Sequence, residues 1–309
     1  MIQMILDHVR LIVVIVGVVA IILYSADSAF AATDLMRLPL GDGHISARPE
    51  QGSVWPCRTE TFGTRRTHGG EWIKSDGTFD FSNKPTTEGE VIWSHQITIS
   101  LERNTRRIVG NDLPNHPTGE FPIRPSSKVY RYDTNPNRIR AQEILVELPA
   151  SPSVAGRASC VPFGAIGILL TGGLFFNALD ANGEDAVAHE IQDKCQGHPQ
   201  RRGMYHYHNL TTCHNDEGTT HSSLVGFAFD GFGLFGRRGE GGTLLSNSDL
   251  DECHGHTHEI PWDGNIISMY HYHATWEYPY TVGCFKGMPQ HLPRPERPLR
   301  PDRPSRRVR

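Results

Sequence analysis

Apolar and polar residues alternate over short stretches of the chain, and this alternation is the main structural signal in the sequence. Between residues 91 and 101 every second residue except His95 is apolar, which predicts a β-strand with one buried face. His95 falls on that face, where a lone histidine is more commonly hydrogen-bonded within the core than bound to a ligand. Shorter strand-like runs follow at residues 128–132 and 144–148.

Helical spacing is found at residues 184–194, where Val187 and Ile191 are one turn apart on a face suited to burial. Asp185 and His189 are also four residues apart, so a helix would place them side by side on another face. A carboxylate beside an imidazole can form an acid/base pair or orient a metal ligand, and these two residues are therefore the candidate catalytic pair. A surface ion pair without a function is the alternative.

The second half of the chain carries the same three motifs twice. A strand that ends in a glycine turn occurs at 166–172 and again at 225–231. An Asp-x-Cys-x-Gly-His sequence follows at 193–198 and 251–256, and a Met-Tyr-His-Tyr-His sequence at 204–208 and 269–273. Two copies of one supersecondary unit usually pack about a pseudo-twofold axis, because neither copy can bury its apolar face alone. We predict a mainly β fold, of the α+β type with few short helices, in which copies at about 160–213 and 223–284 pack about such an axis.

Four parts are expected along the chain. Residues 1–31 form a secretory signal peptide, because an apolar block precedes the small residues of a cleavage site at Ala29-Phe30-Ala31. This block is shorter than the roughly 20 residues that span a bilayer, so we expect no transmembrane segment after cleavage. An irregular N-terminal region follows at 32–90 and the duplicated domain at 91–288. A disordered tail rich in arginine and proline is expected at 289–309.

All six cysteines lie beyond the signal peptide, which favours three disulfides formed in an oxidising compartment, either secreted or periplasmic. Six cysteines allow 15 pairings. Symmetry between the two copies selects one of them, because related cysteines at related positions should make related bonds. We therefore predict the pairs Cys195–Cys213, Cys253–Cys284 and Cys57–Cys160.

The histidines of the repeated Tyr-His-Tyr-His sequence form the first candidate metal site. Residues two apart in an extended strand share a face, so each strand presents its two histidines on one side and its two tyrosines on the other. A pseudo-twofold axis would bring both strands together. We expect the four imidazoles to converge on one site suited to copper or zinc, formed by His206, His208, His271 and His273.

A second group of histidines lies just before each of these strands. His198 and His256 occupy the same place in the two copies. His254, His256 and His258 alternate, so an extended strand would present all three on one face, although a loop is equally compatible with the sequence. The alternative to a metal is a core network in which the imidazoles donate to backbone carbonyls.

The repeated Tyr-His-Tyr-His sequence, together with residues 251–258, resembles the YHYH-domain family of secreted proteins. The resemblance covers about residues 91–288 and is strongest from Ala188 onward. It implies that one YHYH domain fills this region, and it is consistent with a metal site. The family is named for its motif, and the resemblance implies no mechanism.

The net charge of −4 is unevenly distributed along the chain. Residues 292–309 carry seven arginines against Glu296 and Asp302, so the preceding part is acidic, which argues against a nucleic-acid partner. Arg-Pro recurs every three residues in this tail, a period that matches polyproline II. We expect a solubilising tail or, alternatively, a tether to an acidic surface such as anionic lipid, polysaccharide or the protein's own acidic body.

These features favour an extracytoplasmic protein that binds copper or zinc through the YHYH histidines and releases the metal as the pH falls through the imidazole range near about 6.5. One alternative is a metal-dependent enzyme, either a copper oxidoreductase using the adjacent tyrosines or a zinc hydrolase using Asp185 or His189. Another is a non-catalytic surface interaction module with structural histidines. The sequence contains no phosphate-binding glycine loop, serine nucleophile elbow or His-Glu-x-x-His helix.

Overall fold

The structure is a computed structural model that describes residues 33–58 and 69–290. The expected signal peptide and most of the expected tail lie outside the described residues. Among those that are described, no helix is long and apolar enough to cross a membrane. The chain divides into two units, Met1–Asp34 and Leu35–Arg309, and all the elements below belong to the second.

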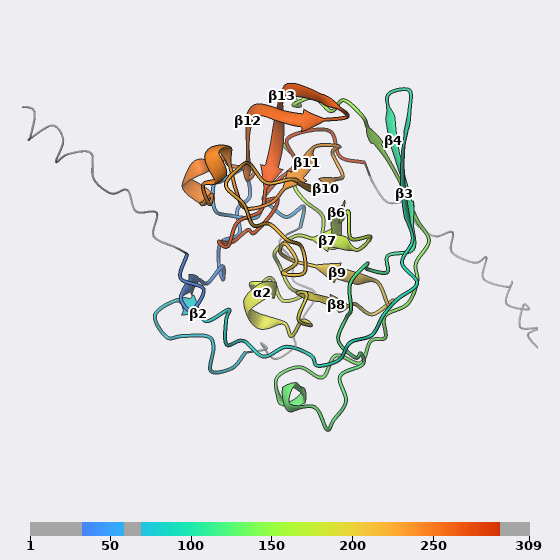
Figure 1. The fold of residues 1–309 in the computed structure, drawn as a ribbon. Helices are drawn as coiled ribbons and strands as arrows, with labels where there is room; N and C mark the ends of the chain where they lie inside the picture. Colours follow the sequence, from blue (N-terminus) through green and yellow to red (C-terminus); the bar gives the residue numbers. More distant parts are fainter. Residues whose placement is uncertain (1–32, 59–68, 291–309) are drawn as a thin grey trace, which may run out of the picture. The chain divides into compact units, whose positions relative to one another are not determined.

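An eight-stranded sheet forms the centre of the fold and confirms the mainly β class (Figure 1). The first copy supplies β6 (Ala165–Leu169), β7 (Leu174–Phe176), β8 (Gly197–Pro199) and β9 (Tyr205–Tyr207). The second copy supplies β10 (Leu224–Ala228), β11 (Gly233–Phe235), β12 (Gly255–Trp262) and β13 (Asn265–His273). Across the sheet the order is β12, β13, β11, β10, β6, β7, β9 and β8, so both halves have the same succession of strands outward from the central pair.

The central pair joins equivalent strands of the two copies. β6 and β10 are antiparallel, and Phe227 lies opposite Ile168, its counterpart at an offset of 227 − 168 = 59 residues. On either side the strands pair in the same way, since β7 is parallel to β9 and β11 is parallel to β13. This register is the one that a pseudo-twofold arrangement requires, and the rotation itself stays a prediction.

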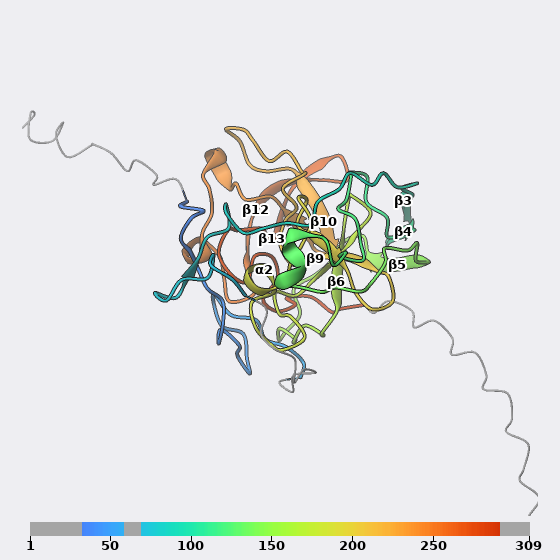
Figure 2. The same ribbon diagram turned by 90° about the horizontal axis from the view of Figure 1, so that it is seen from below.

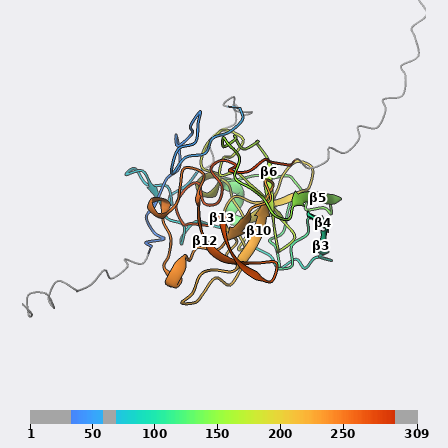
Figure 3. The ribbon, with the colours of Figure 1, turned by 90° about the horizontal axis from the view of Figure 1, so that it is seen from above.

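A three-stranded antiparallel sheet contains β3 (Ile97–Glu102), β4 (Thr105–Gly110) and β5 (Ile144–Pro149), which lie together at one edge in Figures 2 and 3. β5 confirms the strand expected at 144–148. The strand expected at 91–101 begins only at Ile97, and its supposed buried face is wrong, because Leu101 is 51% exposed on an edge strand. His95 hydrogen-bonds to the Leu113 carbonyl, as expected of a histidine without a ligand.

The remaining elements are short. β1 (Leu38–Pro39) and β2 (Thr78–Phe79) pair in the N-terminal region, which is otherwise largely irregular where it is described. Residues 128–132 were expected as a strand, but they contain the 3₁₀ helix η1 (Lys128–Arg131), which buries Val129 alone. Two further 3₁₀ helices are η2 (Glu240–Gly242) and η3 (Asn247–Asp249).

The helix α2 (Ala186–His189) is shorter than the expected helix at 184–194. It begins after Asp185, whose carboxylate accepts the N–H groups of the first turn. It ends because Glu190 has an extended backbone, with φ −86° and ψ 147°. The chain therefore leaves the helix well before the Asp193 turn.

The three disulfides join the predicted pairs, and the connectivity deduced from symmetry is confirmed. Cys195–Cys213 and Cys253–Cys284 each link the Asp-x-Cys turn of one copy to the segment that follows its YHYH strand, and Cys57–Cys160 ties the N-terminal region to the start of the first copy. Such bonds fit an oxidising compartment.

The tyrosines of the two YHYH strands are buried on the opposite side from the histidines, and carboxylates anchor three of them, whereas the Tyr207 hydroxyl bonds to His116 and Thr171. Tyr205 donates to Asp193 at 2.9 Å, and Tyr270 donates to the equivalent Asp251 at 2.9 Å. The hydroxyl of Tyr272 donates to Asp230 at 2.6 Å and accepts the Lys286 N–H at 2.7 Å. These bonds fix the orientation of the strand, so the intervening histidines face the other way.

We expect Tyr272→Phe to lower the free energy of unfolding by about 1.5–3 kcal/mol, because it leaves a buried carboxylate and an amide N–H each short of one partner. Urea denaturation of the disulfide-bonded protein measures this value. Tyr130→Phe is the matched control, since it removes a hydroxyl from a partly exposed ring on η1. Equal losses in the two variants would contradict the role given to the Tyr272 hydroxyl.

Candidate metal centres

The histidines of the first copy form a compact group, here called the first cluster, made of His198, His206 and His208. His198 on β8 lies directly opposite His206 on β9, and His208 follows one residue after β9 ends. Their ring centroids are 4.5 to 5.6 Å apart, and all three residues are at most 4% exposed. One nitrogen from each ring lies within 4.8 Å of the others, a spacing at which a single ion can be held.

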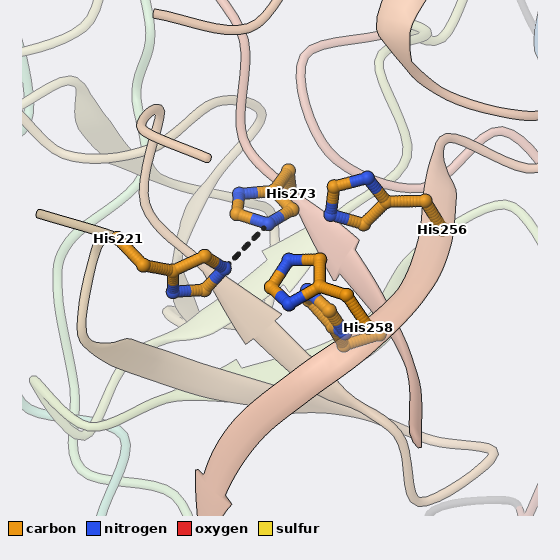
Figure 4. Close-up of side chains that lie close together, drawn as sticks. His221, His256, His258 and His273 are labelled. Carbon is orange, nitrogen blue, oxygen red and sulfur yellow. Dashed lines mark hydrogen bonds between the residues drawn. The ribbon is translucent and has the colours of Figure 1, made fainter. Parts of the chain in front are cut away.

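Four histidines of the second copy and His221, which comes just before it, form the second cluster, shown in part in Figure 4. His256 on β12 lies opposite His271 on β13, which repeats the cross-strand pair of the first cluster. His273 completes the same trio, with its ring centroid 4.9 Å from that of His256. Two more imidazoles join it, from His221 and His258. His221 Nε2 lies 3.1 Å from His273 Nε2.

Backbone carbonyls hold the rings of both YHYH strands in equivalent orientations. The Nδ1 atom of His208 lies 2.6 Å from the Asn177 carbonyl, and Nδ1 of His273 lies 2.6 Å from that of Gly236. His271 Nδ1 is 3.0 Å from the Met269 carbonyl. A carbonyl can only accept, so each Nδ1 carries the proton and each Nε2 presents a lone pair. Histidine ligands are usually oriented by a bond of this type.

Several buried ring nitrogens have no hydrogen-bond partner among the described residues. Within the two clusters they are the Nε2 atoms of His256, His258 and His271 and both ring nitrogens of His198, whose Nε2 lies 3.3 Å from the Glu190 carboxylate without forming a hydrogen bond. An unsatisfied buried polar atom costs about 1–3 kcal/mol, and folded proteins contain few of them. A copper or zinc ion bound by these lone pairs would remove this cost, so the donor set fits the metals expected from the sequence.

Burial favours the neutral form of several imidazoles in the two clusters. Desolvation, together with the neighbouring imidazoles, lowers the pKa of His271 to about 3 and that of His256 to about 4. The pKa values of His206 and His273 lie well below the usual value for the same reason. Neutral imidazoles are the form that binds a metal.

The expectation of one shared site for the four YHYH histidines is wrong. Four strands, β7, β6, β10 and β11, separate β9 from β13. At about 4.8 Å between neighbouring strands, the two YHYH strands are roughly 24 Å apart along the sheet. Each pair of histidines instead meets an upstream histidine of its own copy, so the YHYH histidines belong to two separate clusters.

The structure removes one histidine from the expected metal ligands and adds another. His254 lies outside the second cluster, because it occupies a left-handed turn position with φ 77°, and its Nε2 lies 3.0 Å from the Thr275 hydroxyl. Its counterpart Gln196 has the same conformation, with φ 66°. His221 was missed because it precedes the repeated motifs. If the sequence alignment of β6 with β10 is extended toward the N-terminus, His221 aligns with Pro162.

The candidate catalytic pair is not formed, and this correction removes the residues named for a zinc hydrolase. Asp185 is fully buried and accepts hydrogen bonds from the Gly41 N–H and the Tyr280 hydroxyl. His189 Nε2 lies 2.8 Å from the carboxylate of Asp42 instead. The two side chains diverge because Asp185 caps the helix.

The first cluster opens into a cavity of about 1290 Å³. Glu190, the residue that ends α2, also lines this cavity, and its carboxylate lies 3.3 Å from Nε2 of both His198 and His208. A zinc ion held by the three imidazoles alone would keep its fourth position open toward the cavity, with the Glu190 carboxylate beside it. The cavity provides a route by which a metal or a small molecule can reach the cluster.

Comparison with known protein families gives one match, to the family described as YHYH protein, over residues 145–243. The matched segment includes the first cluster and His221, and it ends before β12 and β13. It confirms the resemblance seen in the sequence. No curated protein and no solved structure matches the chain.

We expect the metal-free protein to lose stability as the pH falls below about 6.5. Above that pH the imidazoles of His256 and His271 are neutral in both the folded and the unfolded state. Below it the unfolded chain protonates them, whereas the folded chain keeps them neutral until the pH reaches about 4 at His256 and about 3 at His271. Each such imidazole contributes about 1.4 kcal/mol per pH unit.

Urea denaturation after chelation, at pH 7 and pH 5, measures this slope. His271→Gln should reduce it by about 1.4 kcal/mol per pH unit, because one buried imidazole is removed. His44→Gln, at an exposed position, is the control and should leave it unchanged. Equal stability at the two pH values in the parent protein would contradict the prediction.

Proposed function

Since the chain carries a YHYH domain over residues 145–243, we propose that the protein is an extracytoplasmic metal-binding protein that holds copper or zinc at its two histidine clusters. The YHYH histidines are ligands in both clusters. His198 completes the first cluster, and His221, His256 and His258 complete the second.

The observation that carries this proposal is the common orientation of the imidazoles. In both copies Nδ1 atoms of the YHYH histidines face backbone carbonyls, and one nitrogen from each ring of a cluster lies within 4.8 Å of the others. A hydrogen-bonded core network would give the buried ring nitrogens protein partners, whereas those of His198, His256 and His271 include atoms without one. A surface interaction module with dispersed histidines has no need for this arrangement.

The two enzyme alternatives receive less support. A copper oxidoreductase using the adjacent tyrosines would need their hydroxyls near the metal, but Tyr205 and Tyr270 donate to aspartates on the far side of their strands. Asp185 and His189, named for a zinc hydrolase, do not line the cavity at the first cluster. Metal binding is therefore the function proposed.

Export is part of the proposal, and the three disulfides support it. Tethering through the arginine-rich tail stays a prediction.

We expect the purified protein, made without a histidine tag, to hold one copper or zinc ion per cluster. The double variant His206→Ala, His208→Ala should lose the ion of the first cluster, and His271→Ala, His273→Ala that of the second, because each removes two ligands from one trio. Elemental analysis after gel filtration gives the metal content per chain.

His44→Ala is the control, since it removes an exposed histidine that belongs to neither cluster. Parent protein without stoichiometric copper or zinc at neutral pH would overturn the proposal. So would a metal content that both double variants keep in full.

We further expect the bound metal to resist mild acid and to leave the second cluster below about pH 6.5. Protons compete with the metal for each imidazole. Because burial lowers the pKa of His256 and His271, protons displace the metal from these two residues only at a lower pH. Metal retained after dialysis at successive pH values measures this. Complete loss at or above pH 6.5 would show that the ligands titrate as ordinary exposed imidazoles.

A further inference from the structure

The two clusters share one trio but differ at two positions around it. His198, His206 and His208 of the first cluster correspond to His256, His271 and His273 of the second. The two additional ligands of the second cluster, His221 and His258, correspond to Pro162 and Gln200, at offsets of 221 − 162 = 59 and 258 − 200 = 58.

Both of these first-copy residues line the cavity. Pro162 and Gln200 belong to its wall, and the trio of the first cluster forms another part of it. Where the second copy extends an imidazole toward the trio, the first copy has a side chain that cannot bind zinc or copper well. The same arrangement of strands therefore gives a second cluster surrounded by protein ligands and a first cluster that faces the cavity.

We propose that the first cluster is an open metal centre at which a small aromatic molecule with one ligating oxygen, of the phenol class, binds the metal from within the cavity. The second cluster is a closed centre that takes no outside ligand. This inference rests on the proposed metal-binding function. Closed coordination is typical of structural sites, whereas an open position is typical of sites that bind substrates.

The chemistry of the cavity selects this class of ligand. Its wall includes the aromatic rings of Tyr130, Phe163, Phe176 and Phe229, which favour a flat apolar body. The ring of Phe176 stacks on His206 at a centroid distance of 3.9 Å, so this aromatic surface reaches the metal ligands.

The charges on the wall exclude other ligands. Asp133, Asp180 and Glu190 line the cavity against one cation, Arg201, so a second negative charge on the ligand would be repelled. Asp133 and Asp180 are also buried and accept backbone N–H groups of nearby loops. A neutral body with a single donor oxygen at the metal meets these conditions. The volume exceeds the roughly 300–1000 Å³ of ordinary ligand pockets, so more than one ring can fit.

The test uses two full-length single-cluster proteins loaded with cobalt(II), whose visible spectrum reports its coordination. His271→Ala, His273→Ala keeps the first cluster, and His206→Ala, His208→Ala keeps the second. The probes are azide, a small anion, and 4-phenylphenol, which carries the aromatic body. Metal content is measured first in each protein.

We expect both probes to change the spectrum of the first-cluster protein and neither to change that of the second-cluster protein. Pro162→His in the first-cluster protein should keep the metal and weaken 4-phenylphenol binding by about tenfold or more, because the new imidazole takes the open position. Pro162→Ala is the matched control and should keep the phenol response.

Spectral changes in both single-cluster proteins, or in neither although both hold metal, would overturn the inference while leaving the proposed metal binding intact. A response to azide without one to 4-phenylphenol would overturn the ligand class. Absence of metal from both proteins would instead contradict the proposed function itself.

Discussion

Two aspartates, Asp193 and Asp251, hold the turns on which both histidine clusters depend. In each copy one carboxylate oxygen accepts the N–H of the cysteine two residues later and of the glycine four residues later, and the carboxylate also accepts the hydroxyl of the first YHYH tyrosine. This contact joins the turn, the disulfide and the YHYH strand. Because the tyrosine is held on one face, strand alternation directs the histidines to the other. The second copy repeats these hydrogen bonds on longer strands, since β12 and β13 have 8 and 9 residues where β8 and β9 have 3 each.

The separation of the two clusters follows from the way in which the copies join. β6 and β10 form the central antiparallel pair, so every later strand of each copy is added outward, toward opposite edges of the sheet. Equivalent residues meet only next to the centre, as Ile168 and Phe227 do. The YHYH strands are third from the centre in each half, and their histidines therefore find partners within their own copy.

A few residue differences between the two copies give their histidine clusters different surroundings. The trio of imidazoles is common to both, and the carbonyls that orient it occupy equivalent positions at Asn177 and Gly236. The positions of Pro162 and Gln200 decide whether the trio faces a cavity or further imidazoles. The family match covers the cavity-bearing copy and stops before β12, which is consistent with the two copies having diverged.

Spacing along the chain determined the alternation of tyrosine and histidine, the strand at 144–148 and the mainly β class, and comparison of the two copies determined the disulfide pairing. Spacing was wrong for residues 128–132 and for the length of the helix that begins at Ala186, where tertiary burial outweighed weak local preference. Only the tertiary structure decided that β6 and β10 meet at the centre, that His221 joins the second cluster and that His254 turns away from it. Long-range strand pairing is set by which apolar faces are buried together, and no spacing along the chain records that choice.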